Sequence, residues 1–161
     1  VPALLDGETV ITQSMAIAEY LEETGQGMKL LPVDAAARAR VRSLCQVVAC
    51  DIHPLNNISV LNYLVNDMGL SDVQKMRWYQ HWIAAGLGGF EAMVSDSPLT
   101  GTYCHGDELS LADVFLIPQI YNAQRFDCDV SAYPTVMRIH DACQELEAFQ
   151  QAHPDNQPDN E

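Results

Sequence analysis

The chain has 161 residues, of which 22 are acidic and 8 are Lys or Arg, so its formal net charge is -14 at pH 7. The apolar fraction of 48% is typical of a globular protein with a packed core and argues against disorder. The basic residues are scattered along the sequence and form no patch. Neither nucleic acid nor an anionic membrane surface is therefore expected as a partner.

The five cysteines are widely spaced, and their number is odd. This pattern argues against a disulfide framework and favours a reducing, cytoplasmic environment. No stretch approaches the length of a membrane span. The chain begins with Val1 rather than Met and does so inside a strand-like run, so we expect it to be a fragment or a processed form.

Residues 1–11 predict a β-hairpin. Asp6-Gly7 is a strong signal for a two-residue turn, with strand-forming residues on both sides. Pro2 lacks an N–H group, so its strand should lie at a sheet edge, unless Pro2 is a special cis residue. Because a lone hairpin is marginally stable in water, we expect that a partner for it is missing from these 161 residues.

Helical patterns fill the rest of the chain. The predicted helices are 14–23, 35–51, 55–64, 71–95, 110–126 and 133–146, with a linker at 27–33, a loop at 98–108 and a loosely packed tail from His153. Pro54 should kink or interrupt the long helical run that begins after Asp34. Gly86, Gly88 and Gly89 weaken their helix by propensity, and we expect them to allow close helix–helix approach.

The order of these elements predicts the fold class. A hairpin and a helix come first, then a linker, then four or five helices. The chain is therefore predicted to be mainly α, with a small α/β segment at 1–26 followed by an all-α domain at 34–161.

Generic catalytic motifs are weak. The sequence contains no Cys-x-x-Cys and no His-Glu-x-x-His motif, so no metal is expected. A Cys–His nucleophile pair is possible, but most cysteines lie in apolar helical runs and are expected to be buried and inert. Trp78 and Trp82 are one helical turn apart, which indicates core packing.

Gln13-Ser14 is a more pointed feature, because it lies between the hairpin and a predicted helix start. Ser14 can act as the N-cap of that helix, and the free N–H groups there can accept a carboxylate. From spacing alone, a plain capping role is the favoured interpretation.

The joint order of several segments resembles the zeta class of glutathione transferases, which includes maleylacetoacetate isomerase and bacterial maleylpyruvate isomerases. The segments are Val1–Ala3 with the Asp6-Gly7 turn, Thr12–Ser14, Glu19–Leu21, Asp51–Asn57, Gly106-Asp107 with Ser110–Asp113, Pro118–Phe126 and His153–Asp159. The resemblance covers essentially the whole chain. It implies that 1–26 is the C-terminal part of a thioredoxin-like glutathione-binding domain and that 34–161 is the all-α domain.

The resemblance also implies roles for individual residues. Five residues would contact the cofactor glutathione: Val1, Gln13, Ser14, His53 and Asn57. A cis Pro2 would expose the backbone of Val1, and Gln13 and Ser14 would hold the γ-glutamyl carboxylate at the helix start. Arg125 would bind a carboxylate of the small dicarboxylate substrate, because a planar guanidinium suits that geometry.

The implied activity is the glutathione-dependent cis–trans isomerisation of maleylacetoacetate or maleylpyruvate to the fumaryl isomer. The family further implies a cytoplasmic homodimer that acts in tyrosine, phenylalanine or other aromatic catabolism. Its thiol-activating segment, of the Ser-Ser-Cys type, precedes the hairpin, so no catalytic residue is expected within the 161 residues. We expect this chain alone to bind glutathione weakly or not at all and to show no turnover.

Two alternatives stay open at this point. The same fold could carry out glutathione-dependent dehalogenation or conjugation of small α-halo acids. The chain could also be a non-catalytic binding or dimerisation module, which would agree with the expected lack of a thiol-activating segment.

Overall fold

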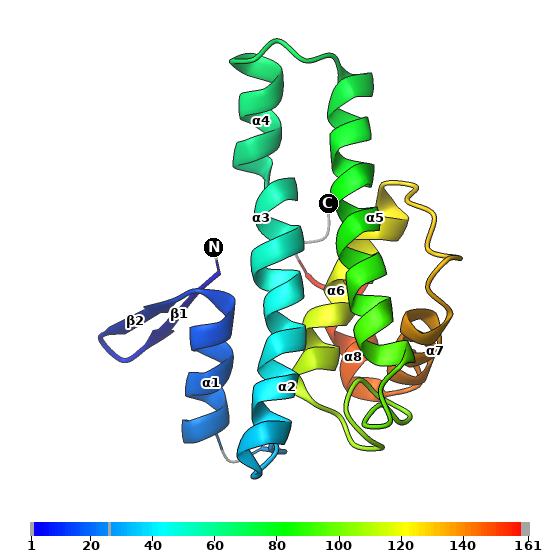
Figure 1. The fold of residues 1–161 in the computed structure, drawn as a ribbon. Helices are drawn as coiled ribbons and strands as arrows, with labels where there is room; N and C mark the ends of the chain where they lie inside the picture. The colour runs from blue at the N-terminus through cyan, green and yellow to red at the C-terminus, as the bar shows by residue number, and fades with distance from the viewer. Residues whose placement is uncertain (1, 26, 159–161) are drawn as a thin grey trace.

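The computed structural model describes residues 2–25 and 27–158, and it shows a hairpin and one helix beside a set of packed helices (Figure 1). The predicted fold class is confirmed: the protein is mostly helical, with a small α/β part at its N-terminal end. The elements are β1 (Ala3–Asp6), β2 (Thr9–Thr12), α1 (Ser14–Thr24), α2 (Ala35–Gln46), the π-helix η1 (Val47–Ile52), α3 (His53–Asn56), α4 (Ile58–Asn66), α5 (Asp72–Ser95), α6 (Leu111–Arg125), α7 (Pro134–Gln144), α8 (Glu147–Ala152) and the 3-10 helix η2 (Pro154–Asn156).

The hairpin forms as predicted and is tied to α1. Strands β1 and β2 pair antiparallel, with Asp6 opposite Thr9 and Gly7 in the turn at φ 58°. Glycine suits this turn because a side chain is disfavoured at positive φ. The Tyr20 hydroxyl donates a hydrogen bond of 2.6 Å to the Asp6 carboxylate, which fixes the turn against the helix.

The long rod of α2, η1, α3 and α4 shows how the chain accommodates Pro54. Proline cannot donate to the carbonyl four residues earlier, and its ring crowds that carbonyl. The backbone widens into a π-turn just before Pro54, where the N–H of His53 donates to the carbonyl of Val48, five residues earlier. The interruption that the sequence predicts falls at Asn57, which has extended backbone at ψ 146° and starts α4 by accepting from the N–H of Ser59.

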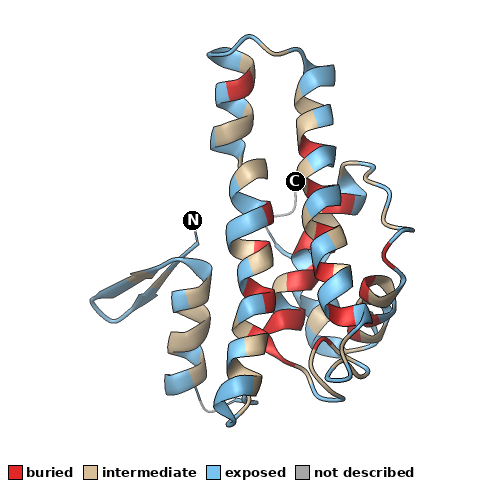
Figure 2. Ribbon diagram, in the orientation of Figure 1, coloured by how far each residue is buried: buried red, intermediate tan, exposed pale blue. Residues whose placement is uncertain are grey.

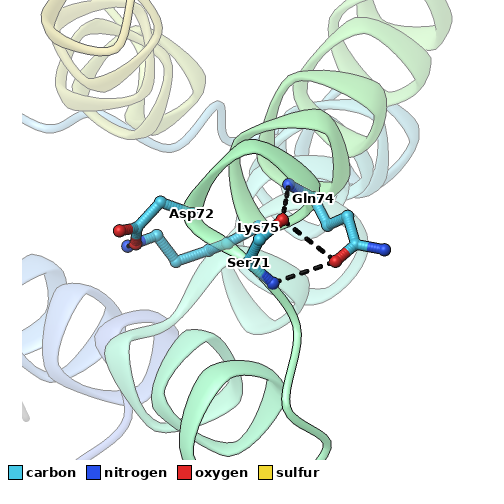
Figure 3. Close-up of polar contacts among 4 residues, drawn as sticks. All are labelled: Ser71, Asp72, Gln74 and Lys75. Carbon is cyan, nitrogen blue, oxygen red and sulfur yellow. Dashed lines mark hydrogen bonds and ion pairs between the residues drawn. The ribbon is translucent and has the colours of Figure 1, made fainter.

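Helix α5 begins at a capping box, drawn in Figure 3. The Gln74 side chain accepts from the N–H of Ser71 at 2.9 Å, and the Ser71 hydroxyl accepts from the N–H of Gln74 at 3.4 Å. Lys75 and Asp72 add an ion pair of 2.8 Å in the first turn. These contacts satisfy N–H groups that a helix start leaves unpaired, and they support a helix that contains three glycines.

The core lies where α2, η1, α5, α6 and α7 meet, and Figure 2 shows the buried residues gathered there. The largest fully buried apolar side chains are Phe90, Leu44, Ile52, Ile83, Leu87, Leu116, Ile120 and Ile139. Trp78 is only half-buried: it donates from Nε1 to the carbonyl of Leu55 at 2.7 Å and contacts the Trp82 ring edge-on. Among the residues that the structure describes, no helix is both long enough and apolar enough to cross a bilayer.

The capping box that the sequence predicts at the start of α6 is confirmed, and both of its residues, Ser110 and Asp113, are buried. Asp113 is fully buried, and its carboxylate accepts from the N–H and the hydroxyl of Ser110 at 2.9 and 2.8 Å. Its other oxygen accepts from the N–H of Cys104 at 2.8 Å. The motif therefore joins the 98–108 loop to the start of α6.

The tail that the sequence predicts to pack loosely is exposed at residues 154–158, but hydrogen bonds tie it to α8. The Asn156 amide donates to the carbonyl of Gln150 at 2.7 Å, and the Gln157 amide donates to that of Gln151 at 2.7 Å. The His153 ring also meets Tyr121 edge-on at 5.3 Å. The amide side chains of the tail thus donate to carbonyls at the C-terminal end of α8, where a helix has few backbone donors left.

Gly86 is required by close packing, whereas Gly89 is not. A Cβ added at Gly86 would lie 2.1 Å from Cγ1 of Ile52, whose side chain is fully buried and cannot swing away. A Cβ added at Gly89 would meet nothing within 4 Å. The predicted close helix approach is thus confirmed at Gly86.

We expect Gly86→Ala to destabilise the protein by about 1–3 kcal/mol, because the added methyl group overpacks the contact with η1. The matched control is Gly89→Ala, which should leave stability unchanged or raise it by about 0.5–1 kcal/mol through helix propensity. Urea unfolding of both variants measures this. A Gly86→Ala variant as stable as the Gly89→Ala variant would contradict the packing argument.

Candidate functional site

The start of α1 differs from the sequence prediction. Ser14 is the first helical residue rather than the N-cap, so the prediction that it caps the helix is wrong. The N-cap is Gln13, at φ 74° and ψ 123°, and its side chain makes no capping hydrogen bond. A positive φ is uncommon for a residue other than glycine, and here it turns the chain from β2 directly into the helix.

This helix start is suited to an anion. The carbonyl of Gln13 accepts from the N–H of Ile17 at 3.0 Å, the Gln13 side chain makes no capping hydrogen bond, and the first turn has no acidic residue. Unpaired N–H groups and the positive end of the helix dipole attract a carboxylate. Gln13 and Ser14 are both exposed, so a ligand can reach them.

His53 and Asn57 are brought together by the geometry of the rod. They lie one turn apart, with His53 Nε2 3.4 Å from Asn57 Nδ2. The Asn57 oxygen is already used, because it accepts from the N–H and the hydroxyl of Ser59 at 3.0 Å each. Its amide nitrogen is therefore directed to His53, which is itself exposed.

Arg125 occupies the last turn of α6 and is exposed. Its guanidinium carbon lies 5.7 Å from the centre of the Phe126 ring, and that ring packs at 4.5 Å on Tyr79. None of the ion pairs found among the described residues involves Arg125. A guanidinium that forms no ion pair with a described carboxylate can bind an anionic ligand.

The structure thus brings together some of the predicted residues and not others. Gln13 and Ser14 lie at the start of α1, His53 and Asn57 at the junction of η1, α3 and α4, and Arg125 at the end of α6. No hydrogen bond or ring contact between described residues joins these three groups. Val1 lies outside the described residues, and so does the predicted cis peptide that joins it to Pro2.

Two hollows of the surface lie away from the predicted ligand residues. One, of about 260 Å³, lies between η1 and α5 and is lined by Val47, Asp51, Trp82, Gly86 and Met93, among others. The other, of about 300 Å³, is lined by residues of α5 and of the segment 127–129. Neither hollow is lined by a predicted ligand residue, so the candidate site consists of exposed or half-buried polar groups outside both hollows.

Two features of the site were missed by sequence reasoning. The π-turn that presents His53 has the same apolar spacing as an ordinary helix, and only Pro54 signals that the hydrogen-bond pattern must change there. The contacts of Glu22 on α1 with the linker cross eight or nine residues, and no local pattern marks them.

Comparison with known proteins tests the resemblance. Residues 1–23 match the family model described as the N-terminal domain of glutathione S-transferases. A probable maleylacetoacetate isomerase from Vibrio cholerae is 48% identical over 99% of this chain and 73% of its own length.

Two solved structures agree over almost the whole chain. One is a holo structure of a maleylpyruvate isomerase described as a bacterial zeta-class glutathione S-transferase, with 44% identity and a TM-score of 0.96 over 100% of this chain and 76% of the other. The second is a maleylacetoacetate isomerase from Methylobacterium extorquens AM1 with bound malonate and GSH, with 44% identity and a TM-score of 0.95 over 98% and 74%.

The chain belongs to the zeta class of glutathione transferases. This identification confirms the resemblance that the sequence indicated, together with the enzyme class. The isomerase names of the relatives favour isomerisation over the α-halo-acid and non-catalytic alternatives.

The cysteines of this zeta-class chain are not arranged as nucleophiles. Cys45, Cys104 and Cys143 are fully buried, and all five cysteines are free. Burial raises the pKa of Cys45 and Cys143 to about 12, with a further contribution from Asp113, and raises the pKa of Cys104 well above its usual range. No group of three or more His, Cys, Asp or Glu in the described residues could hold a metal ion.

We expect the exposed Cys50 to be the fastest-reacting thiol in the folded protein, and the half-buried Cys128 to react more slowly because burial raises its pKa. A thiol with a pKa near 12 is only about 0.01% thiolate at pH 8, so Cys45 and Cys143 should react at least about 10³-fold more slowly until the protein unfolds. Titration with a disulfide reagent at pH 8, with and without denaturant, measures this. Cys50→Ser should remove the fastest phase. If more than one thiol of that variant reacts before unfolding, a thiol besides Cys128 is accessible and the buried assignment is wrong.

Proposed function

We propose that this zeta-class protein catalyses the glutathione-dependent cis–trans isomerisation of a maleyl compound, maleylacetoacetate or maleylpyruvate, to its fumaryl isomer. The observation that carries the proposal is the match to isomerases over almost the whole chain, including one with GSH and malonate bound. Three polar groups support it: the start of α1 and Arg125, which could each bind a carboxylate, and the His53–Asn57 pair.

Gln13 and Ser14 would hold the γ-glutamyl carboxylate of glutathione. The fit is supported by the helix start itself, where Gln13 and Ser14 are exposed and the Gln13 side chain makes no capping hydrogen bond. The positive φ of Gln13 is a local backbone cost that a binding role explains. Val1 is proposed to contact the cysteinyl part through its backbone, as the family resemblance implies.

Arg125 would bind a carboxylate of the substrate, and His53 and Asn57 would line the cleft that receives the reactants. A dianion is repelled by a chain of net charge -14, so its binding needs a local cation. Arg125 has no ion-pair partner among the described residues and offers a planar pair of donors to a carboxylate.

When bound, glutathione supplies a thiolate that adds to the cis double bond and leaves after rotation, so the tripeptide is not consumed. The residues of this chain would bind and orient the two reactants, which lowers the barrier by proximity. We assign no thiol-activating residue within the 161 residues. Isomerase turnover by these 161 residues alone would contradict that assignment.

The family also supports the proposal of a homodimer in the cytoplasm, acting in tyrosine and phenylalanine catabolism or a related aromatic pathway. Five free cysteines agree with a reducing compartment. A full-length protein that sediments as a monomer at micromolar concentration would contradict the dimer.

In the full-length enzyme, Arg125→Ala should raise the KM for the maleyl substrate by about 10–100-fold, because a charged hydrogen bond contributes about 1.5–3 kcal/mol. Arg125→Lys should recover only part of the loss, since it lacks the planar fork. The KM for glutathione should stay within about twofold. Steady-state kinetics with either substrate varied measures both values.

The matched control is Arg77→Ala, which removes an exposed arginine from α5 and should leave both KM values unchanged. If Arg125→Ala keeps the wild-type KM and kcat, the role assigned to Arg125 is wrong.

A further inference from the structure

The side chain of Glu22 joins α1 to the linker that follows it. One carboxylate oxygen accepts from the N–H of Leu30 at 2.9 Å, and the other accepts from the N–H of Leu31 at 3.2 Å. Both bonds are partly buried, so water competes with them less than it would at an open surface. Leu30 and Leu31 themselves pack against the hydrophobic core. The end of α1 is therefore held to a segment that belongs structurally to the helical part.

The same linker segment is bonded to the start of α6. The carbonyl of Leu30 accepts from the N–H of Leu111 at 2.9 Å. Leu111 is the first residue of α6, whose first N–H groups have no partner within the helix. Leu30 thus connects α1, through Glu22, with α6, through Leu111.

A second contact fixes α1 against α2. Glu19 lies one turn before Glu22 on the same face of α1, and its carboxylate forms an ion pair of 2.5 Å with Arg42. Figure 1 shows α1 running beside α2. Two carboxylates on one face, bonded to α2 and to the linker, restrict both the translation of α1 and its rotation about its axis.

We propose that Glu22 is a positioning residue of this enzyme. By holding α1 to the linker and to α6, it sets the place of the α1 start, where glutathione binds, relative to Arg125, where the substrate binds. This inference rests on the function proposed above. A misplacement of 1 Å between reacting groups can lower a rate by about 10²-fold, so a contact remote from the reacting atoms can control kcat.

The contact can be removed without detaching the helix, because Met15 and Ala18 also pack α1 against the core. Glu22→Gln keeps one acceptor oxygen and replaces the other with an amide nitrogen, which cannot accept from an N–H. Glu22→Ala removes both acceptors. Loss of positioning should therefore be partial in the first variant and larger in the second.

The test is made on the full-length protein. We expect Glu22→Gln to lower kcat about tenfold and Glu22→Ala about 100-fold. Calorimetric Kd values for glutathione and for malonate, each measured alone, should stay within about twofold of wild type. Glu23→Gln is the matched control, because Glu23 is the exposed neighbour on α1 whose side chain makes no hydrogen bond or ion pair with another described residue, and the kcat of this variant should not change.

Three results would overturn the inference: a wild-type kcat in Glu22→Gln, a kcat loss matched by an equal loss of glutathione affinity, or an equal kcat loss in Glu23→Gln. Thermal unfolding of each variant shows whether a lowered Tm occurs with unchanged kcat, which would mean that Glu22 only stabilises the fold. The proposed function fails separately, if the wild-type enzyme does not isomerise either maleyl compound or if Arg125→Ala behaves as wild type.

Discussion

The buried carboxylate of Asp113 is the contact on which the helical part depends. It accepts three hydrogen bonds from Ser110 and Cys104, and each donor would lose its partner in a buried environment if the carboxylate were removed. A buried N–H without a partner costs about 1–3 kcal/mol. Helix α6 packs on α2, η1 and α7, so a displaced α6 start would disturb most of the core. Arg40 and Arg138 hold the same loop from outside, through the carbonyls of Cys104 and Gly101.

The start of α6 is also linked to α1 through the linker residue Leu30. Asp113 fixes the loop before this helix, and the N–H of Leu111 binds the linker residue that Glu22 of α1 also holds. The contact that organises the core is therefore linked to α1 as well, through Leu111 and Leu30.

Much of the fold could be predicted from local sequence, and much of the site could not. Apolar spacing located the helices, Ser71 with Gln74 marked a start, and Gly86 marked a close contact. Local patterns failed at Gln13, because glutamine rarely adopts a positive φ, and the turn is imposed by the hairpin before it. The site residues came from resemblance. Spacing alone could pair His53 with Asn57, which lie one turn apart, but it could not relate them to Arg125, which lies at the end of a different helix, α6.

The backbone is irregular at two of the three proposed ligand positions. Gln13 has a positive φ, and the backbone widens into a π-turn just before His53. The positive φ of Gln13 costs about 1–3 kcal/mol and persists only where surrounding contacts enforce it. Here Tyr20 holds the hairpin before Gln13, and the buried Ile52 anchors the π-turn against Gly86. At Gln13 and at His53, a contact between residues with no proposed ligand role therefore supports a backbone that departs from a regular helix and carries an exposed polar side chain. This combination is the expected arrangement for a site that must orient two reactants.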